Sequence, residues 1–100
     1  MVKILERDLE RHFSKECKRL GIESLKIIPR FSVGWPDRLV ILDNSEVLWV
    51  ELKTLTGVLS AKQIKVHNTL RKHGHIVYVL RTKEEITNVL ETTFISTKCS

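Results

Sequence analysis

Residues 34–53, GWPDRLVILDNSEVLWVELK, form the stretch around which the rest of the chain is organised. Two apolar runs flank the turn sequence DNSE, a pattern that predicts an antiparallel β-hairpin. Asp37 enters the first run, and Glu51 and Lys53 close the second. Because charged side chains are costly in buried strands unless something pairs with them, these three residues indicate a functional site.

Length and composition predict one globular domain over residues 1–100. The chain is 42% hydrophobic and 29% charged, a balance that argues against disorder. No apolar run approaches the roughly 18–20 residues of a membrane span, and the N-terminus turns charged too early for a signal peptide. Two cysteines, Cys17 and Cys99, make no disulfide framework, so we expect a protein of the reducing cytoplasm.

The net charge of +5 favours a polyanionic partner. Nucleic acid is the commonest polyanion that basic proteins bind, and it is the partner we expect. A basic surface with no such partner is the alternative that charge alone leaves open.

The elements before and within the hairpin follow from periodicity. Apolar residues recur every three or four positions over residues 3–20, which predicts a helix that ends at Gly21. Residues 25–31 predict a first strand, and Pro29 near its end makes it an edge strand or shortens it. A buried strand and its antiparallel partner are predicted over two ranges, 38–42 and 47–52.

A capping box marks the next helix. Ser60 and Gln63 have the spacing of reciprocal caps, and the helix is predicted to run to about His73. Residues 76–80 then predict a short β-branched strand.

A second capping box, Thr82 with Glu85, opens a last helix predicted to end near Glu91, with no clear pattern from Thr92. The resulting order is α-β-β-β-α-β-α. Three meandering strands followed by a crossover helix and a further strand predict an α/β fold with a mixed central sheet flanked by helices.

The charged residues at the end of the hairpin suit phosphodiester cleavage. Strand alternation puts Glu51 and Lys53 on one face, and the hairpin can bring Asp37 beside them. Two carboxylates can hold Mg²⁺ or Mn²⁺, with the Leu52 carbonyl as a further ligand, and such an ion stabilises phosphate charge and activates water. Lys53 would contact the phosphate and orient or deprotonate that water. The alternatives are turn chemistry for Asp37 and a plain cross-strand pair for the other two.

The same residues carry a family resemblance. Pro36-Asp37, thirteen residues and then Glu51-Leu52-Lys53 resemble the PD-(D/E)xK nuclease superfamily. The chain resembles the VRR-NUC family more narrowly, over about residues 6–82, in these motifs: GxPDRLV at 34–40, VELKT at 50–54, Gly57, Leu59-Ser60, Gln63, and Gly74 before a strand. The resemblance implies a restriction-endonuclease-like core, α-β-β-β-α-β(-α), which agrees with the predicted element order.

The resemblance also implies roles. Asp37 and Glu51 would bind metal, Lys53 would be catalytic, and Gln63 on the second helix would be the fourth motif residue. For Gln63 the competing role is only to cap the backbone amide of Ser60.

A glutamate on the first helix completes the set that the resemblance implies. Glu6 matches better, as a metal ligand and catalytic residue, and Glu10 is the alternative one turn later. Both flank the apolar stripe of the helix, so periodicity does not separate them. A solvated helix surface is the plainer interpretation of either residue.

Some basic side chains must meet phosphate if the chain cleaves nucleic acid, and affinity would then fall steeply with salt. Trp35, next to the Pro-Asp motif, can stack on a base. The candidate DNA contacts are Arg30, Trp35, Arg38, Lys62 and Lys65. Solvated positions for the cations, and packing against the loop for Trp35, are the alternatives.

We therefore expect a divalent-metal-dependent DNA endonuclease in a single VRR-NUC-like domain, with products bearing a 5′ phosphate as the resemblance implies. Without an appended DNA-reading module, recognition of DNA structure is expected rather than of sequence. Stand-alone members of the family are similar in organisation to Holliday-junction resolvases.

Symmetric cleavage of a four-way junction needs two active sites, so a homodimer is expected, with the first helix or the C-terminal segment as its interface. Neither a small-molecule substrate nor a membrane partner is expected. The alternatives are a DNA-binding module that has kept the fold and lost catalysis, and an RNA-directed hydrolase.

Overall fold

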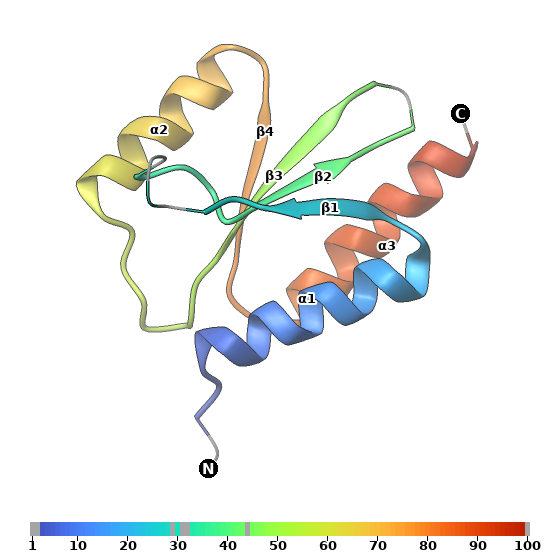
Figure 1. Cartoon of the computed structure of the whole chain (residues 1–100), viewed down its shortest axis with the longest axis horizontal. Helices are drawn as coiled ribbons and strands as arrows, with labels where there is room; N and C mark the ends of the chain where they lie inside the picture. Colours follow the sequence, from blue (N-terminus) through green and yellow to red (C-terminus); the bar gives the residue numbers. More distant parts are fainter. Residues whose placement is uncertain (1–2, 29, 31–32, 44, 100) are drawn as a thin grey trace.

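The computed structural model describes residues 3–28, 30, 33–43 and 45–99. Its elements follow the predicted order α-β-β-β-α-β-α, which confirms the α/β fold (Figure 1). They are α1 Glu6–Leu20, β1 Glu23–Lys26, β2 Arg38–Ile41, β3 Val47–Leu52, α2 Ala61–Lys72, β4 Ile76–Leu80 and α3 Lys83–Cys99. Within the described part, no helix has both the length and the apolar character needed to cross a membrane.

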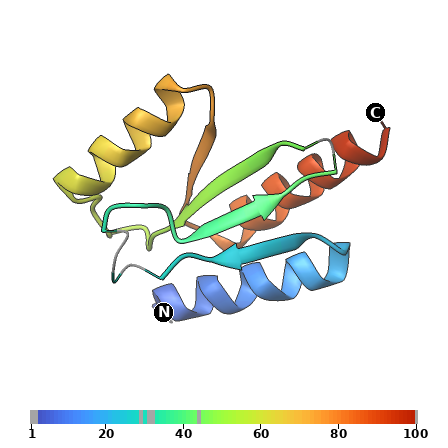
Figure 2. The same cartoon turned by 45° about the horizontal axis from the view of Figure 1, so that its top comes forward.

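The four strands form one mixed sheet in the order β1-β2-β3-β4. The first three are antiparallel, with Arg38 opposite Val50 and Leu39 opposite Trp49 in the hairpin. β4 lies parallel to β3, because α2 carries the chain back along the sheet. Figures 1 and 2 show α1 and α3 side by side below the sheet, whereas α2 lies on the other side, next to β4.

The apolar core lies between the sheet and the α1–α3 pair. Alternate residues of the strands point toward these helices and are buried there. The cluster consists of Leu9, Phe13, Cys17, Val40, Leu48, Val50, Leu52, Leu80, Ile86 and Leu90. Truncating one of its large members to alanine would cost about 2–5 kcal/mol.

Polar contacts also join α1 to α3. Thr87 Oγ1 donates to Glu16 Oε1 at 2.8 Å, and His12 Nε2 lies 2.8 Å from Thr87 Oγ1. Arg19 donates from Nε to Glu16 Oε2 at 2.8 Å and from Nη2 to Glu91 Oε1 at 2.9 Å. These hydrogen bonds and ion pairs therefore join α1 to α3.

Several predicted elements are confirmed in detail. β3 and β4 have the predicted bounds, and α2 ends within one residue of the expected His73. In the first capping box the Ser60 amide donates to Gln63 Oε1 at 2.8 Å, and the Gln63 amide donates to Ser60 Oγ at 3.1 Å. Thr82 and Glu85 make the equivalent pair at the start of α3.

The predicted first strand, residues 25–31, is wrong in its bounds. α1 ends at a left-handed Gly21, with φ of 68°, as expected. β1 begins at Glu23, two residues after Gly21, and ends at Lys26. Glu23 already pairs with Ile41 of β2. It is an edge strand, as predicted. Pro29 lies outside the described residues.

The prediction of a buried strand over 38–42 is also wrong in part. β2 ends at Ile41, and of its four residues Val40 alone is fully buried. Ile41 is 46% exposed, because the described elements place no helix over the outer face of β1 and β2. The hairpin therefore has one packed face and one open face.

The last helix does not end near Glu91, as predicted, but continues to Cys99. Its later turns lie beside the segment that joins α1 to β1, since Thr93 and Phe94 line one cavity together with Gly21 and Ile22. β-branched residues weaken the helical signal beyond Thr92, and tertiary contact overrides that weak propensity.

Candidate active site

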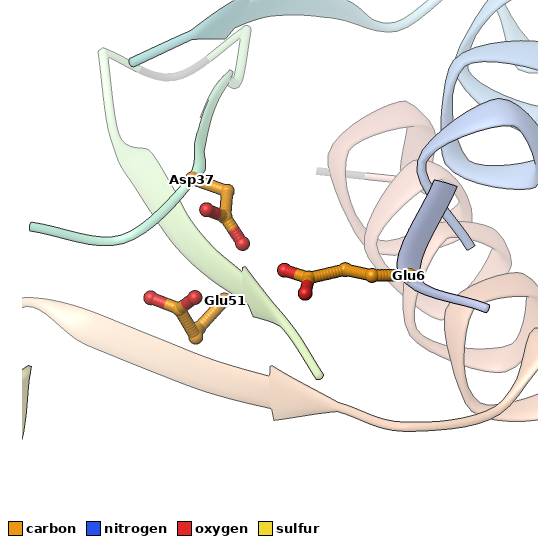
Figure 3. Close-up of side chains that lie close together, drawn as sticks. All are labelled: Glu6, Asp37 and Glu51. Atoms are coloured by element: carbon orange, nitrogen blue, oxygen red, sulfur yellow. The ribbon is translucent and has the colours of Figure 1, made fainter. Parts of the chain in front are cut away.

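Three carboxylates from separate parts of the chain meet at one end of the hairpin, as Figure 3 shows. Glu6 is the first residue of α1, Asp37 immediately precedes β2, and Glu51 lies in β3. Each offers one oxygen, and these atoms all lie within 4.8 Å of one another. The predicted approach of Asp37 to Glu51 is present, and Glu6 completes the cluster.

Geometry separates the two glutamates that the sequence left open. Glu10 lies away from the cluster, with its carboxylate 3.6 Å from Lys26 Nζ in an ion pair. Glu6 faces the other carboxylates, and partial desolvation and the charge of Asp37 raise its pKa while Lys53 opposes the rise. Glu6 is therefore the candidate ligand on the first helix.

Asp37 is fixed by backbone groups on both sides. The Leu52 amide donates to Asp37 Oδ2 at 2.8 Å, and the Ile27 amide donates to the Asp37 carbonyl at 2.7 Å. In the preceding loop Gly34 has φ of 88°, and a Cβ there would come within 2.6 Å of Lys62 Cγ. The loop thus packs directly on α2, and the aspartate is positioned by strands and helix together.

Glu51 is the most deeply buried member, with 1% of its surface exposed. On the α2 side, its Oε1 lies 3.5 Å from His67 Nε2, and its Oε2 accepts from Gln63 Nε2 at 3.5 Å. Burial, then hydrogen bonding and repulsion by Asp37, raise the pKa of Glu51 to about 9 despite the charge of Lys53. Desolvation lowers the pKa of His67, so its imidazole brings no positive charge.

This donor set fits a hard divalent cation. Glu51 Oε1 is buried and has no hydrogen-bond partner among the described residues, and carboxylate oxygens are the ligands that Mg²⁺ and Mn²⁺ prefer. A bound cation would give this oxygen a partner and offset the repulsion among three carboxylates. Metal binding by the Leu52 carbonyl stays a prediction.

Lys53 follows β3 directly, and its amide donates to the Leu80 carbonyl at 3.1 Å. Its positive charge acts to lower the pKa of both Glu6 and Glu51. The charge of Lys53 therefore acts on two of the three carboxylates of the cluster.

Gln63 caps the start of α2 and also contacts the carboxylate cluster, and its role as the fourth motif residue stays a prediction. Its Oε1 caps the Ser60 amide, while its Nε2 points at the carboxylate of Glu51. One amide therefore joins the start of α2 to the candidate metal centre.

The candidate DNA cations do not share one environment. Arg38 faces the core, where its guanidinium carbon lies 5.4 Å from the centroid of the Phe13 ring and its Nε is buried. Strand alternation turns Arg38 toward α1, where it is half-buried, and its contact with DNA stays a prediction. The candidate DNA-contacting cations that are exposed are Arg30, Lys62 and Lys65.

Trp35 belongs to a small aromatic group. It is 42% exposed and lies 5.4 Å from Trp49, ring centre to ring centre, at an interplanar angle of 52°. Trp49 Nε1 donates to His75 Nδ1 at 3.3 Å. Trp35 therefore contacts Trp49 of β3 while part of its side chain stays exposed, and stacking on a base stays a prediction.

Sequence reasoning missed His67 and Arg81. His67 lies four residues after Gln63, one helical turn along the same face, and this spacing was the available signal. Arg81 follows β4 and donates from Nη1 to the carbonyls of Thr54 at 2.7 Å and Gly57 at 2.6 Å. No local pattern marks it, because its partners are more than 20 residues away along the chain.

Comparisons with known proteins identify the family. The VRR-NUC domain family matches residues 2–84. "Putative nuclease p44" of Acyrthosiphon pisum secondary endosymbiont phage 1 is 32% identical over 81 residues, covering 81% of this chain and 87% of that protein. A solved structure described as a VRR_NUC domain is 25% identical, with a TM-score of 0.75 and coverage of 86% of this chain and 94% of that one. This chain therefore belongs to the VRR-NUC family, a nuclease domain with the restriction-endonuclease-like fold.

Proposed function

We propose that this chain is a DNA endonuclease that depends on Mg²⁺ or Mn²⁺. The observation that carries the proposal is the buried, unpartnered oxygen of Glu51 in a cluster of three carboxylates. A carboxylate buried without compensation destabilises a fold, so its presence in a nuclease domain supports a cation site. The Lys53 charge beside the cluster supports a hydrolytic role for that site.

When bound, a divalent cation supplies positive charge to phosphate oxygens and lowers the pKa of water. Glu6, Asp37 and Glu51 would hold it, with the Leu52 carbonyl as a further ligand. Lys53 would donate to the scissile phosphate and orient or help deprotonate the attacking water. The water oxygen bonds to phosphorus as the P–O3′ bond breaks, and the leaving 3′ oxygen takes a proton from solvent, which leaves a 5′ phosphate and a 3′ hydroxyl.

Exposed groups around this site would hold the DNA. Lys62 and Lys65 on α2, together with Arg30, would contact backbone phosphates, and the open part of Trp35 would stack on a base. We propose action in the cytoplasm, because the buried thiol of Cys17 is free and suits a reducing compartment.

We further propose selection of branched DNA, four-way junctions above all, by a homodimer, since paired cuts need two sites. The apolar stripe of α1 packs in the core, so that helix offers little for an interface. Leu25, 53% exposed, and Ile41 lie on the open face of the sheet, which is the surface proposed for the second copy. Light scattering should give the mass of two chains, and Leu25→Lys should give the mass of one.

The deciding experiment compares cleavage of labelled linear duplex, single strand, flap and four-way junction DNA with Mg²⁺, Mn²⁺ or EDTA. Asp37→Asn keeps the shape of the side chain and removes its charge, so it should abolish cleavage. Glu10→Gln is the matched control, because Glu10 pairs with Lys26 outside the cluster. We expect metal-dependent cutting that survives only in the control, with the junction cut fastest.

Each other outcome has a distinct meaning. Junction binding without cleavage of any substrate would overturn the enzyme proposal and favour a DNA-binding module. Cleavage of RNA in place of DNA would favour the RNA-directed hydrolase. Cleavage that persists in Asp37→Asn would show that the site lies elsewhere.

A further inference from the structure

A cavity of about 440 Å³ opens beside the candidate active site. Three segments form its wall: the residues before α1, the loop after β3 and the start of α3. Its apolar side chains include Ile4 and Leu55, and its basic ones include Lys3 and Lys83. We call it the side pocket, and none of the groups assigned so far to metal or phosphate lines it.

The side pocket adjoins the cluster along the chain on two sides. Ile4 lies two residues before Glu6, and Thr54 directly follows Lys53. The segments that carry Glu6 and Lys53 are therefore continuous with the wall of the cavity.

The loop that carries Leu55 is held in place before any ligand arrives. The Arg81 guanidinium donates to the carbonyls of Thr54 and Gly57, and the Gly57 amide donates to the Thr54 carbonyl at 3.1 Å. Leu55 is nevertheless 74% exposed, and Ile4 is 42% exposed. A fixed loop that presents an exposed aliphatic group at a cavity is preorganised for an apolar ligand, because little order has to be gained on binding.

The polar groups of the pocket distinguish a base from a phosphate. Just before α3, Glu85 Oε1 accepts from the backbone amides of both Arg81 and Thr82, so these two amides are not available to a phosphate. Glu84 also lines the cavity, and its carboxylate would repel a phosphate placed inside. The lysine ammonium groups of Lys3 and Lys83 form no ion pair within the described ranges, so they suit phosphates next to the cavity.

We propose that the side pocket binds one unpaired nucleobase of the cleaved strand, next to the scissile phosphate. Small-ligand pockets commonly enclose about 300–1,000 Å³, so the volume of about 440 Å³ admits a base. Enzymes that take a base out of the stack hold it between apolar side chains, the character of Ile4 and Leu55 here. The inference rests on the proposed nuclease function and gives it a source of selectivity, because branch points and flaps supply unpaired bases and intact duplex does not.

Abasic scanning tests the proposal. The cut is first mapped on a flap or junction, and an abasic residue is then placed at each of the flanking positions in turn. For the unmodified protein we expect kcat/KM to fall about tenfold at one flanking position. In Leu55→Ala the intact substrate should already be cut about tenfold more slowly, and the abasic residue should cause no further loss.

Val58→Ala is the matched control, because Val58 is in the same loop and 83% exposed but does not line the pocket. It should keep both the rate and the abasic sensitivity of the unmodified protein. Equal melting temperatures for the two variants would show that Leu55→Ala folds normally.

A binding measurement gives a second readout that needs no cleavage. 2-Aminopurine at the sensitive position, or at each flanking position in turn, should change fluorescence when the protein binds in EDTA, and Leu55→Ala should remove the change. Cleavage with no abasic sensitivity at any position would overturn the side-pocket proposal and leave the nuclease proposal standing. If nothing is cleaved, the fluorescence arm decides alone: a Leu55-dependent change supports the pocket, and its absence overturns it.

Discussion

Glu16 and Glu51 are both buried glutamates, yet their surroundings are opposite. Glu16 is held by Arg19 through two hydrogen bonds and by the Thr87 hydroxyl, and these contacts lower its pKa to about 2. Glu51 has a neutral imidazole and an amide nearby, and its pKa is raised to about 9. Glu16 is thus paired with a guanidinium in the fold, whereas the α2 neighbours of Glu51 are neutral, which suits the cation site proposed for Glu51.

The strongest test of this difference is to replace each glutamate in turn by glutamine, which carries no charge. Glu51→Gln should lower kcat for DNA cleavage by about a hundredfold or more, because it removes a proposed metal ligand, while the melting temperature in EDTA stays equal or rises. Glu16→Gln should leave kcat nearly unchanged and lower the melting temperature. Cleavage assays and thermal unfolding of both variants check this, and a fall in stability for both would mean that Glu51 is structural.

Adding metal in the absence of substrate should distinguish the role of Glu51 from that of Glu16. A ligand at 100 times its Kd stabilises the folded state by about 2.7 kcal/mol, which for a domain of this size raises the melting temperature by roughly 10–20 °C. We expect such a rise with Mn²⁺ for the unmodified protein and for Glu16→Gln. Thermal unfolding of Glu51→Gln should show little rise, and an equal rise would place the metal elsewhere.

A smaller loss of activity is expected on substitution of Gln63, whose neutral amide contacts Glu51. Gln63→Ala removes both the cap on Ser60 and the amide beside Glu51, so it should lower kcat/KM about tenfold and stability by about 1 kcal/mol. Ser60→Ala removes the other half of the capping box, the Ser60 Oγ that accepts from the Gln63 amide, and leaves the side-chain amide beside Glu51 in place. Urea unfolding should give similar losses for the two variants, and cleavage should fall only in Gln63→Ala.

The smallest predicted effect is the acid response of Glu16. Its pKa in the folded protein, about 2, lies below the ordinary value of 4.5, so its contribution to stability is present above pH 4.5 and is lost as the pH falls toward 2. The stability difference between the unmodified protein and Glu16→Gln should therefore be constant near pH 6–7 and shrink below about 4.5. A difference that does not change with pH would mean that the Arg19 contact contributes little.

The parts of the site that the sequence predicts are those fixed by local signals. Asp37, Glu51 and Lys53 stand out because they interrupt apolar runs, and Gln63 because it completes a capping box. Glu6 could be proposed but not chosen over Glu10, since the distinction depends on where α1 docks. The Glu10–Lys26 pair, which makes that distinction, joins a helix to a strand.

The parts that the sequence does not predict depend on contacts between distant segments. The turns of α3 beyond Thr92 are sustained by neighbours near β1, not by their own propensity. The contact between Arg38 and Phe13 likewise depends on how β2 packs against α1, which the sequence does not reveal. Arg81 could not be identified as the residue that holds the loop after β3, because nothing in its neighbourhood along the chain indicates those carbonyls.

The contacts between α1 and α3 have a consequence for the candidate site. Glu6 lies in the first turn of α1, and α1 is joined to α3 through Thr87 and Glu91. Substitutions that break these contacts would therefore act on the carboxylate cluster through the docking of α1, although neither Thr87 nor Glu91 belongs to the cluster.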